Sequence, residues 1–305
     1  MSPMPSLIAL DWGTSNLRAS LLDREGRLLQ ARSTAGGVMA VRDGQFAEAL
    51  LALVGDWLQD HACPLIASGM IGSRQGWREA PYLPCPASLD QAAAALTRIE
   101  LPGGHALSII PGLRCNGADG VVDVMRGEET QLWGAALPAG SCCVLPGTHA
   151  KWAWVGADAR IDGFQTFMTG ELYGLLTQHG ILGRLMEFGH ADADAFAAGV
   201  RLGLAEHASA SHVIFAARTA GLMGTVAPRG LPDYLSGLLV GIEIGGATRR
   251  GKPAAVTVLG DEALAARYEA ALRLAGIAST RAPEDATTRG QWLVARRAGL
   301  LEGHA

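Results

Sequence analysis

One local pattern, a short apolar run that enters a Gly-Thr turn and then continues as a second strand, occurs twice in this chain of 305 residues. In the first copy, residues 7–10 are apolar and lead towards Gly13-Thr14. In the second copy, residues 142–145 lead towards Gly147-Thr148, so the two pairs lie 134 positions apart (147 − 13). A strand, turn and strand repeated in this way predict two domains of similar architecture.

Apolar periodicity in the remaining chain predicts helices between the strands. Apolar residues at helical spacing predict a helix from Phe46 to Leu58, and residues 235–247 form an apolar stretch that predicts a buried helix. That stretch is interrupted by Glu243 and is too short to span a bilayer, so no membrane segment is expected. Strands that alternate with helices indicate α/β domains with helices on the faces of the sheets, and a boundary near residues 135–140.

Composition and cysteine content exclude several classes of protein. The 25 Lys and Arg residues are outnumbered by 29 Asp and Glu residues, so no basic surface for nucleic acid is expected. The five cysteines form no CxxC pair, which argues against a zinc site and against a disulfide framework. The first residues lack the basic and apolar segments of a signal peptide. We therefore expect a cytoplasmic protein with no membrane partner.

The two Gly-Thr turns form the first candidate site. A glycine after a buried strand lets backbone N–H groups approach an anion closely, and a threonine hydroxyl adds a donor. Gly13-Thr14 and Gly147-Thr148 could therefore clamp a triphosphate, and Asp11 could hold Mg²⁺ through water. For one turn alone, a hairpin with Asp11 as a turn cap is the better interpretation, whereas the matched pair favours phosphate binding. The glycine motifs of P-loop and Rossmann nucleotide sites are missing from the corresponding places.

A longer series of motifs accompanies these turns. In chain order it comprises DWGTSNLRA (11–19), GMIGS (69–73), APYL (80–83), IPGL (110–113), MRGEETQL (125–132), PGTHAKW (146–152), MTGEL (168–172) and LSGLL (235–239). In this order the motifs resemble those of the 2-dehydro-3-deoxygalactonokinase family, in the actin/Hsp70/sugar-kinase superfamily. The resemblance extends from about Leu7 to the final predicted helix.

The resemblance implies an α/β fold of two ribonuclease-H-like (actin-like ATPase) domains, with mixed sheets flanked by helices and an active site in the interdomain cleft. Residues 1–138 would form the sugar-binding domain and residues 139–305 the nucleotide-binding domain, with the final helix free to pack back on the first. The implied reaction transfers the γ-phosphate of ATP, with Mg²⁺, to the 6-hydroxyl of 2-dehydro-3-deoxy-D-galactonate. The partner would be this small sugar acid, and a homodimer is left open.

An acidic residue after a glycine, just before the second phosphate motif, acts as the base in related sugar kinases. Gly127-Glu128-Glu129 holds that place here, so Glu128 is predicted to be catalytic together with Asp11, and Glu129 is the alternative. An acceptor hydroxyl needs such a base because it must lose its proton as the O–P bond forms. The competing interpretation is that both glutamates are carboxylates favoured at a helix N-terminus.

Arginine binds carboxylates through a bidentate, permanently charged fork, so Arg18, Arg74 and Arg126 are candidates for the substrate carboxylate. Ordinary surface ion pairs are the alternative for each of the three. Trp77 could pack on a face of the substrate, and Asn16 could bond a hydroxyl or a phosphate.

Three further residues are assigned to the nucleotide. Lys151 could reach a phosphate, and Gly260-Asp261, after a predicted strand, resembles the adenosine-side turn of the superfamily. His149 is interpreted as a structural hydrogen-bonding residue, because no second histidine stands at metal-ligand spacing.

Two other functions fit parts of the sequence. A kinase of the same superfamily for a neutral sugar or another ketodeoxy acid would keep the fold and the ATP chemistry but not the arginine assignments. A nucleotide switch or filament protein, like actin or the ATPase half of a chaperone, would hydrolyse ATP without a small acceptor. A sugar-responsive repressor is not expected, because only ten residues precede Asp11.

Overall fold

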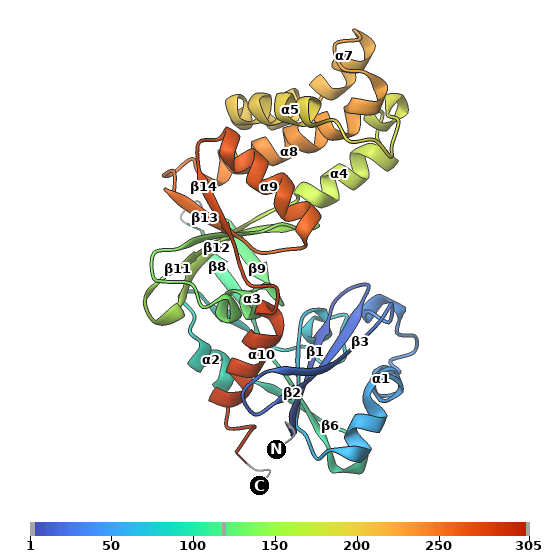
Figure 1. The fold of residues 1–305 in the computed structure, drawn as a ribbon, viewed down its shortest axis with the longest axis vertical. Coiled ribbons are helices and arrows are strands. Elements are labelled where there is room, and N and C mark those ends of the chain that lie inside the picture. The colour runs from blue at the N-terminus through green and yellow to red at the C-terminus, as the bar shows by residue number, and fades with distance from the viewer. Residues whose placement is uncertain (1–3, 118–119, 303–305) are drawn as a thin grey trace. The chain divides into compact units, whose positions relative to one another are not determined.

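Two units divide the chain in the computed structural model, which describes residues 4–117 and 120–302 (Figure 1). The first unit contains Met1–Gly140, Trp154–Phe164 and Pro283–Ala305. The second unit contains Ser141–Ala153 and Gln165–Ala282. The first unit therefore draws on three separate parts of the chain, including its last helix.

A six-stranded sheet of order β3-β2-β1-β4-β7-β6 forms the centre of the first unit. Strands β1, β2 and β3 are antiparallel, β1, β4 and β7 are parallel, and β6 is antiparallel to β7. Helix α1 (Phe46–Asp60) belongs to the core through a buried stripe that includes Leu50, Val54 and Trp57, as its helical spacing predicts. The strand bounds are β1 Pro5–Trp12, β2 Leu17–Asp23, β3 Leu28–Thr34, β4 Leu65–Ser68, β6 Thr97–Glu100 and β7 Ala106–Ile109.

A second, three-stranded sheet in the first unit has the order β5-β8-β9. These short strands span Tyr82–Pro84, Gly112–Asn116 and Val122–Met125, and β9 runs directly into helix α3 (Glu128–Ala135). Helix α2 (Leu89–Ala94) begins with a capping box between Ser88 and Gln91. This sheet carries the turn that precedes the two predicted acidic residues.

The last helix, α10 (Ala286–Arg297), lies beside α3 in the first unit (Figure 1). The two helices approach closely at glycines, because a Cβ on Gly134 would lie 1.8 Å from Ala286 O and a Cβ on Gly290 would lie 1.9 Å from Thr130 O. The buried amide of Gln291 donates to Leu10 O (2.6 Å) and to Ser68 Oγ (2.9 Å). Residues near the end of the chain thus complete the core around β1 and β4.

A five-stranded sheet of order β12-β11-β10-β13-β14 contains the second copy of the sequence repeat. Its strands are β10 Cys142–Leu145, β11 Ala150–Val155, β12 Ile161–Phe167, β13 Ala255–Val258 and β14 Ala278–Arg281. The parallel set β10, β13 and β14 corresponds in order to β1, β4 and β7 of the first sheet. The predicted pair of α/β domains with similar topology and mixed sheets is therefore confirmed.

Helices form the remainder of the second unit, and α4, α5, α7 and α8 group together in Figure 1. Helices α5 and α8 pack backbone to backbone, since a Cβ on Gly203 or Gly241 would lie 2.3 or 2.4 Å from the other helix. The α-helices are α4 Thr169–Gln178, α5 Ala193–Ala205, α6 Ala210–Val213, α7 Ala216–Leu222, α8 Leu231–Ala247 and α9 Glu262–Leu274. Short 3-10 helices lie at Val38–Ala40, Met70–Gly72, Pro102–Gly104, Ala157–Ala159, Leu182–Leu185, His207–Ser209 and Pro228–Gly230.

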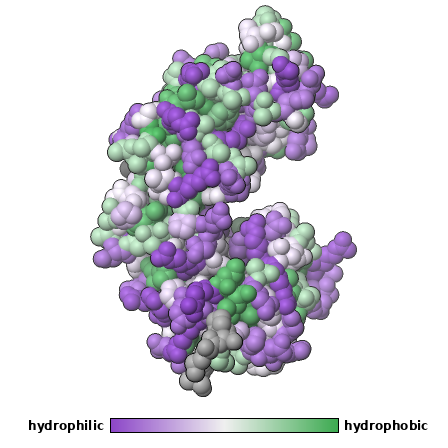
Figure 2. All heavy atoms as spheres, viewed as in Figure 1, coloured by the Kyte–Doolittle hydropathy of each residue, from purple (hydrophilic) through white to green (hydrophobic). Residues whose placement is uncertain are grey.

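The surface is mixed in character. On the face drawn in Figure 2, hydrophilic and hydrophobic residues are interspersed. Exposed apolar side chains include Phe215, Leu222 and Met223 around α7. Within residues 4–117 and 120–302, no helix is both long enough and apolar enough to cross a bilayer.

Candidate active site

Two glycine-containing turns of the first unit bring Asp11 and Glu128 together. Gly69 follows β4 with φ +95°, and a Cβ there would lie 2.8 Å from Trp12 O and 3.6 Å from Asp11 Oδ1. Gly127 precedes α3 with φ +111°, and a Cβ there would lie 3.3 Å from Gly69 Cα. Both positions require glycine, because their backbone conformation and the close approach exclude a side chain. Glu128 follows Gly127 directly, so its carboxylate lies in the electrostatic field of Asp11.

Asp11 is held across the β1–β2 pair by Arg18, whose Nη1 lies 3.1 Å from Asp11 Oδ2. Burial raises the pKa of Asp11, the Arg18 charge opposes this rise, and the Glu128 charge adds to it. Two neighbouring carboxylates are oxygen donors of the kind that Mg²⁺ prefers while it keeps water or phosphate ligands. No group of three or more His, Cys, Asp or Glu that could hold a metal ion occurs in the described residues.

The two adjacent glutamates have different environments. Glu128 is half-buried, and its Oε2 accepts a hydrogen bond of 2.9 Å from Arg126 N. Glu129 is fully buried and accepts from Gly127 N (2.8 and 2.9 Å) and from the Thr130 hydroxyl (3.1 Å). Burial, with the Glu128 charge, raises the pKa of Glu129 to about 7. Glu129 thus holds the turn, and Glu128 is the more accessible acid of the pair.

The first Gly-Thr turn follows Asp11 closely in sequence and presents exposed groups. Gly13 N bonds to Asn16 O (2.9 Å), and Thr14 and Asn16 are exposed. Residues 37–39 brace the turn from the other side through backbone hydrogen bonds to Gly13, Thr14 and Ser15. The turn therefore has a fixed backbone with free polar side chains, which suits an anionic or hydroxylated ligand.

The candidate substrate residues on residues 70–80 lie in different environments. Arg74 is exposed and its Nε lies 3.6 Å from Glu79 Oε1. Trp77 is half-buried, stacks on Phe46 with centroids 5.9 Å apart, and meets Trp12 edge-on at 6.4 Å. One face of the Trp77 ring is therefore used in the core, which limits its use as a platform for substrate.

Arg126 is buried instead of being open to solvent. Its Nη2 donates to Ala80 O (2.8 Å), and its guanidinium lies 4.2 Å from the centroid of the Tyr82 ring. Its Nε and Nη1 are buried and have no hydrogen-bond partner among the described residues. As placed here, Arg126 ties β9 to the segment before β5, and a substrate carboxylate could reach it only after a local rearrangement.

The nucleotide candidates of the second unit meet at one end of its sheet. Strands β10 and β13 are parallel, so the turns that follow them, Gly147-Thr148 and Gly260-Asp261, lie at the same edge. A Cβ on Gly260 would lie 3.6 Å from Pro146 Cδ, which confirms this proximity. The Asp261 carboxylate caps α9 by accepting from Leu264 N (3.0 Å).

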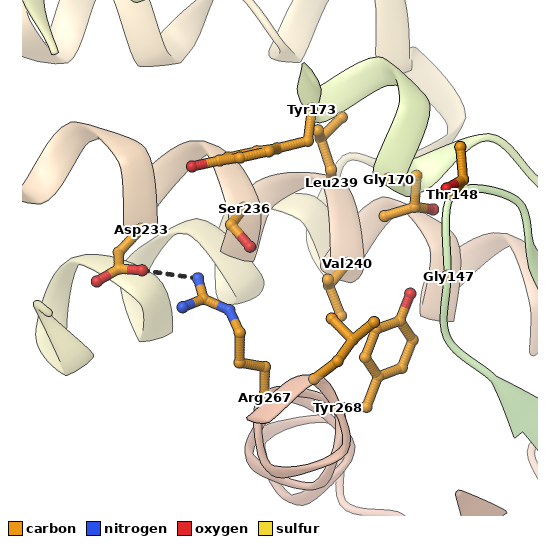
Figure 3. Close-up of a pocket in the computed structure, with 12 residues that line it drawn as sticks. Gly147, Thr148, Gly170, Tyr173, Asp233, Ser236, Leu239, Val240, Arg267 and Tyr268 are labelled. Atoms are coloured by element: carbon orange, nitrogen blue, oxygen red, sulfur yellow. Dashed lines mark ion pairs between the residues drawn. The ribbon is translucent and has the colours of Figure 1, made fainter. Parts of the chain in front are cut away.

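A cavity of about 440 Å³ opens beside the second Gly-Thr turn (Figure 3). Apolar residues of α8 and α9 form much of its wall, and Tyr173 of α4 lies across it. Its polar groups include Ser236 and an ion pair in which Arg267 Nη2 lies 2.7 Å from Asp233 Oδ1. A mostly apolar cavity with a few fixed polar groups next to a phosphate-type turn suits a nucleoside. The sequence did not indicate Tyr173, Asp233 or Arg267, because they come from three helices that meet only in the folded unit.

Residues 148–151 are braced by side chains. Lys151 is buried and its Nζ donates to His149 O (3.0 Å). His149 Nε2 is hydrogen-bonded to Glu171 Oε2, and Glu171 N donates to Thr148 O (3.0 Å). Lys151 therefore supports the turn through the backbone in this structure.

Glu243 is a buried carboxylate behind the wall of the cavity. It accepts from Trp152 Nε1 (2.8 Å), from Tyr268 Oη (2.7 Å) and from the Thr169 hydroxyl. Burial raises the pKa of Glu243 to about 7. Thr169 and Tyr268 also line the cavity, so Glu243 connects α8 to α4 and α9 there. A single carboxylate within an apolar stretch was the sequence signal for this residue.

Comparison with known proteins identifies the relatives of the chain. The family model described as 2-keto-3-deoxy-galactonokinase matches residues 11–294. The 2-dehydro-3-deoxygalactonokinase of Escherichia coli (strain K12) is 39% identical over 274 residues, covering 88% of this chain and 90% of that protein. A Sinorhizobium meliloti protein assigned as a 2-dehydro-3-deoxygalactonokinase superposes with a TM-score of 0.84 at 35% identity, covering 95% of this chain and 98% of that chain.

A more distant structure supports the fold alone. The xylulose kinase of Lactobacillus acidophilus superposes with a TM-score of 0.51 at 10% identity, covering 97% of this chain and 90% of that chain. This similarity agrees with the repeated sheet topology and with the expected actin-like fold.

Proposed function

The chain belongs to the 2-keto-3-deoxy-galactonokinase family, and from this premise we propose that it transfers the γ-phosphate of ATP to the 6-hydroxyl of 2-dehydro-3-deoxy-D-galactonate. The observation that carries the proposal is the match over residues 11–294, which includes every predicted site residue. The acceptor is thus a small sugar acid, and the enzyme is a phosphotransferase with an alcohol group as acceptor.

In this reaction Glu128 is the general base. The 6-hydroxyl oxygen forms a bond to the γ-phosphorus, and the bond from the γ-phosphorus to the bridging oxygen breaks with its electron pair leaving on ADP. Glu128 accepts the hydroxyl proton. Its half-buried position beside Asp11 supports this role, whereas Glu129 is fully buried and already bonded to Gly127 N.

Asp11 would hold Mg²⁺, whose charge would offset that of the phosphates. Arg18 pairs with the Asp11 carboxylate but stays exposed, so its guanidinium would be the one to bind the acid group of the substrate. Thr14 and Asn16 supply exposed donors beside this pair, and Arg74 is the exposed alternative to Arg18. Trp77 and Arg126 would shape the site from within the core.

The second unit is proposed to bind the nucleotide and the first unit the sugar acid, with residues 1–138 and 139–305 as the main contributors. The cavity beside Gly147-Thr148 would take the nucleoside, and Gly260-Asp261 would border it. Lys151 would support phosphate binding indirectly, because its hydrogen bond to His149 O holds the backbone of the turn. A cytoplasmic location and a homodimer stay predictions.

A coupled assay of ADP release tests the proposal. We expect turnover with ATP, Mg²⁺ and 2-dehydro-3-deoxy-D-galactonate, and little turnover without an acceptor. A panel of other ketodeoxy sugar acids and neutral sugars separates this function from that of a related sugar kinase. Equal ADP release with and without any acceptor would identify a nucleotide switch and refute the proposal. A ³¹P–¹H correlation NMR spectrum of the product locates the new phosphate and so tests the assignment of the 6-hydroxyl as the acceptor.

A further inference from the structure

We propose that His149 is a further catalytic residue, which donates a hydrogen bond from its imidazole to the γ-phosphoryl group during transfer, and that Glu171 is its positioning residue. The inference rests on the proposed kinase function. It differs from the sequence interpretation of His149 as a purely structural residue. The observations that support it are the place of His149 in the second turn, the bond to Glu171 and the exposure of the ring.

The place of His149 is fixed by backbone contacts. It follows Gly147-Thr148 directly and precedes β11. Glu171 N donates to Thr148 O (3.0 Å), and a Cβ on Gly170 would lie 2.5 Å from Gly147 O, so the start of α4 packs tightly on the turn. Lys151 Nζ donates to His149 O (3.0 Å). The backbone that aims the imidazole is thus held from α4 and from β11.

The imidazole itself is oriented but not enclosed. Nε2 is bonded to Glu171 Oε2, while the side chain of His149 remains 48% exposed. In the described part of the chain, Nδ1 of His149 has no hydrogen-bond partner. A carboxylate that accepts from one ring nitrogen fixes the ring orientation, and in the doubly protonated ring the other nitrogen donates to a ligand.

The chemistry of phosphoryl transfer needs such a group. Negative charge on the γ-phosphoryl oxygens must be stabilised while the new O–P bond forms and the bond to ADP breaks. A preorganised donor costs no reorganisation at the moment of reaction, and removal of one such donor typically lowers kcat by about 10²–10³-fold. His149 keeps its proton throughout, because the hydroxyl proton goes to Glu128.

The test compares His149→Ala, His149→Gln and Glu171→Gln in the full-length protein with ATP, Mg²⁺ and 2-dehydro-3-deoxy-D-galactonate. We expect kcat to fall about 10²-fold in His149→Ala, with KM for both substrates within about threefold of the wild type. Added imidazole should restore part of the kcat of His149→Ala. His179→Gln, an exposed histidine at the C-cap of α4, is the matched control and should behave as wild type.

The role of Glu171 is tested by a double-mutant cycle. Glu171→Gln should lower kcat about tenfold in the wild-type background and have little further effect in His149→Ala, because it acts through the imidazole. Equal effects in the two backgrounds would show that Glu171 does not act through His149.

Three outcomes would overturn the inference. One is a kcat of His149→Ala within threefold of the wild type. Another is a loss of kcat that imidazole does not rescue and that accompanies a fall in thermal stability, since this would assign His149 to bracing the turn. The last is a wild-type enzyme with no acceptor-dependent turnover, which would refute the proposed function and this inference with it. The first two leave the proposed function intact.

Discussion

The buried acid Glu129 should make the protein less stable as the pH rises, and Glu129→Gln should remove that effect. Its pKa is about 7 in the folded chain, against an ordinary value of 4.5, because of burial and the charge of Glu128. The folded state therefore binds the proton more tightly than the unfolded state between these two values. The stabilising contribution is complete below pH 4.5 and is lost as the pH rises through 7.

The magnitude follows from the difference between the two pKa values. At about 1.4 kcal/mol for each pKa unit, a change from 4.5 to about 7 corresponds to about 3 kcal/mol in the free energy of unfolding. The glutamine can still accept from Gly127 N, so the turn should keep its hydrogen bond. Glu129→Gln should therefore be more stable than the wild type at pH 8, and the difference should shrink or reverse at pH 5.

Urea unfolding at pH 5, 6, 7 and 8, followed by tryptophan fluorescence, measures this effect. The difference between variant and wild type is the relevant quantity, because Glu243 has a similarly raised pKa and contributes its own pH dependence to both proteins. Glu48→Gln, at an exposed position of α1, is the control and should leave the pH dependence unchanged. If the pH dependence of Glu129→Gln matched that of the wild type, the burial argument would be refuted.

Further variants test the other parts of the site. Glu128→Gln should lower kcat by about 10²–10⁴-fold with little change in KM or thermal stability, and near-normal turnover would exclude it as the base. Asp11→Asn should lose most activity at limiting Mg²⁺ without losing stability, as checked by a Mg²⁺ titration of ADP release. Arg267→Ala should raise KM for ATP about tenfold with kcat nearly unchanged, because its ion pair with the buried Asp233 lines the cavity. Arg273→Ala, at an exposed position of the same helix, is the control. Gly290→Ala should lower the free energy of unfolding by about 1–3 kcal/mol, because the overlap with Thr130 O outweighs a gain in helix propensity of about 1 kcal/mol; an unchanged urea midpoint would contradict this.

The sequence predicted those parts of the fold that local patterns determine. The hairpin at the start of each repeat was predicted because apolar runs end at glycine turns, and β10 has the expected bounds, Cys142–Leu145. The buried helix begins earlier than expected, at Leu231, because Pro232 occupies its first turn and is compatible with helix there. The sheet of β5, β8 and β9 was not predicted, since its strands are short and Val122 and Val124 are exposed.

The site was predictable to the extent that its residues follow glycine turns. The glycine-turn pattern selected Asp11, Glu128 and the second Gly-Thr turn as candidates, and their roles stay predictions. The wall of the cavity was not, because Tyr173, Asp233 and Arg267 are brought together by the packing of three helices. The buried position of Arg126 likewise depends on its contacts with Ala80 and Tyr82. No local sequence pattern predicts these contacts.

The hydrogen bond from Gln291 to Leu10 O has a consequence for biosynthesis. Its two residues are separated by 281 positions, so a ribosome that adds about 5–20 residues per second needs roughly 15–55 s between them. During that time the nascent first unit lacks α10, which completes its core. Strands β1 and β4 have no contact with Gln291 until the second unit has been translated. A chain that consists of residues 1–140 alone would never complete this core, because it lacks α10. In the full-length chain, a chaperone could bind the exposed core residues of the first unit until α10 is made.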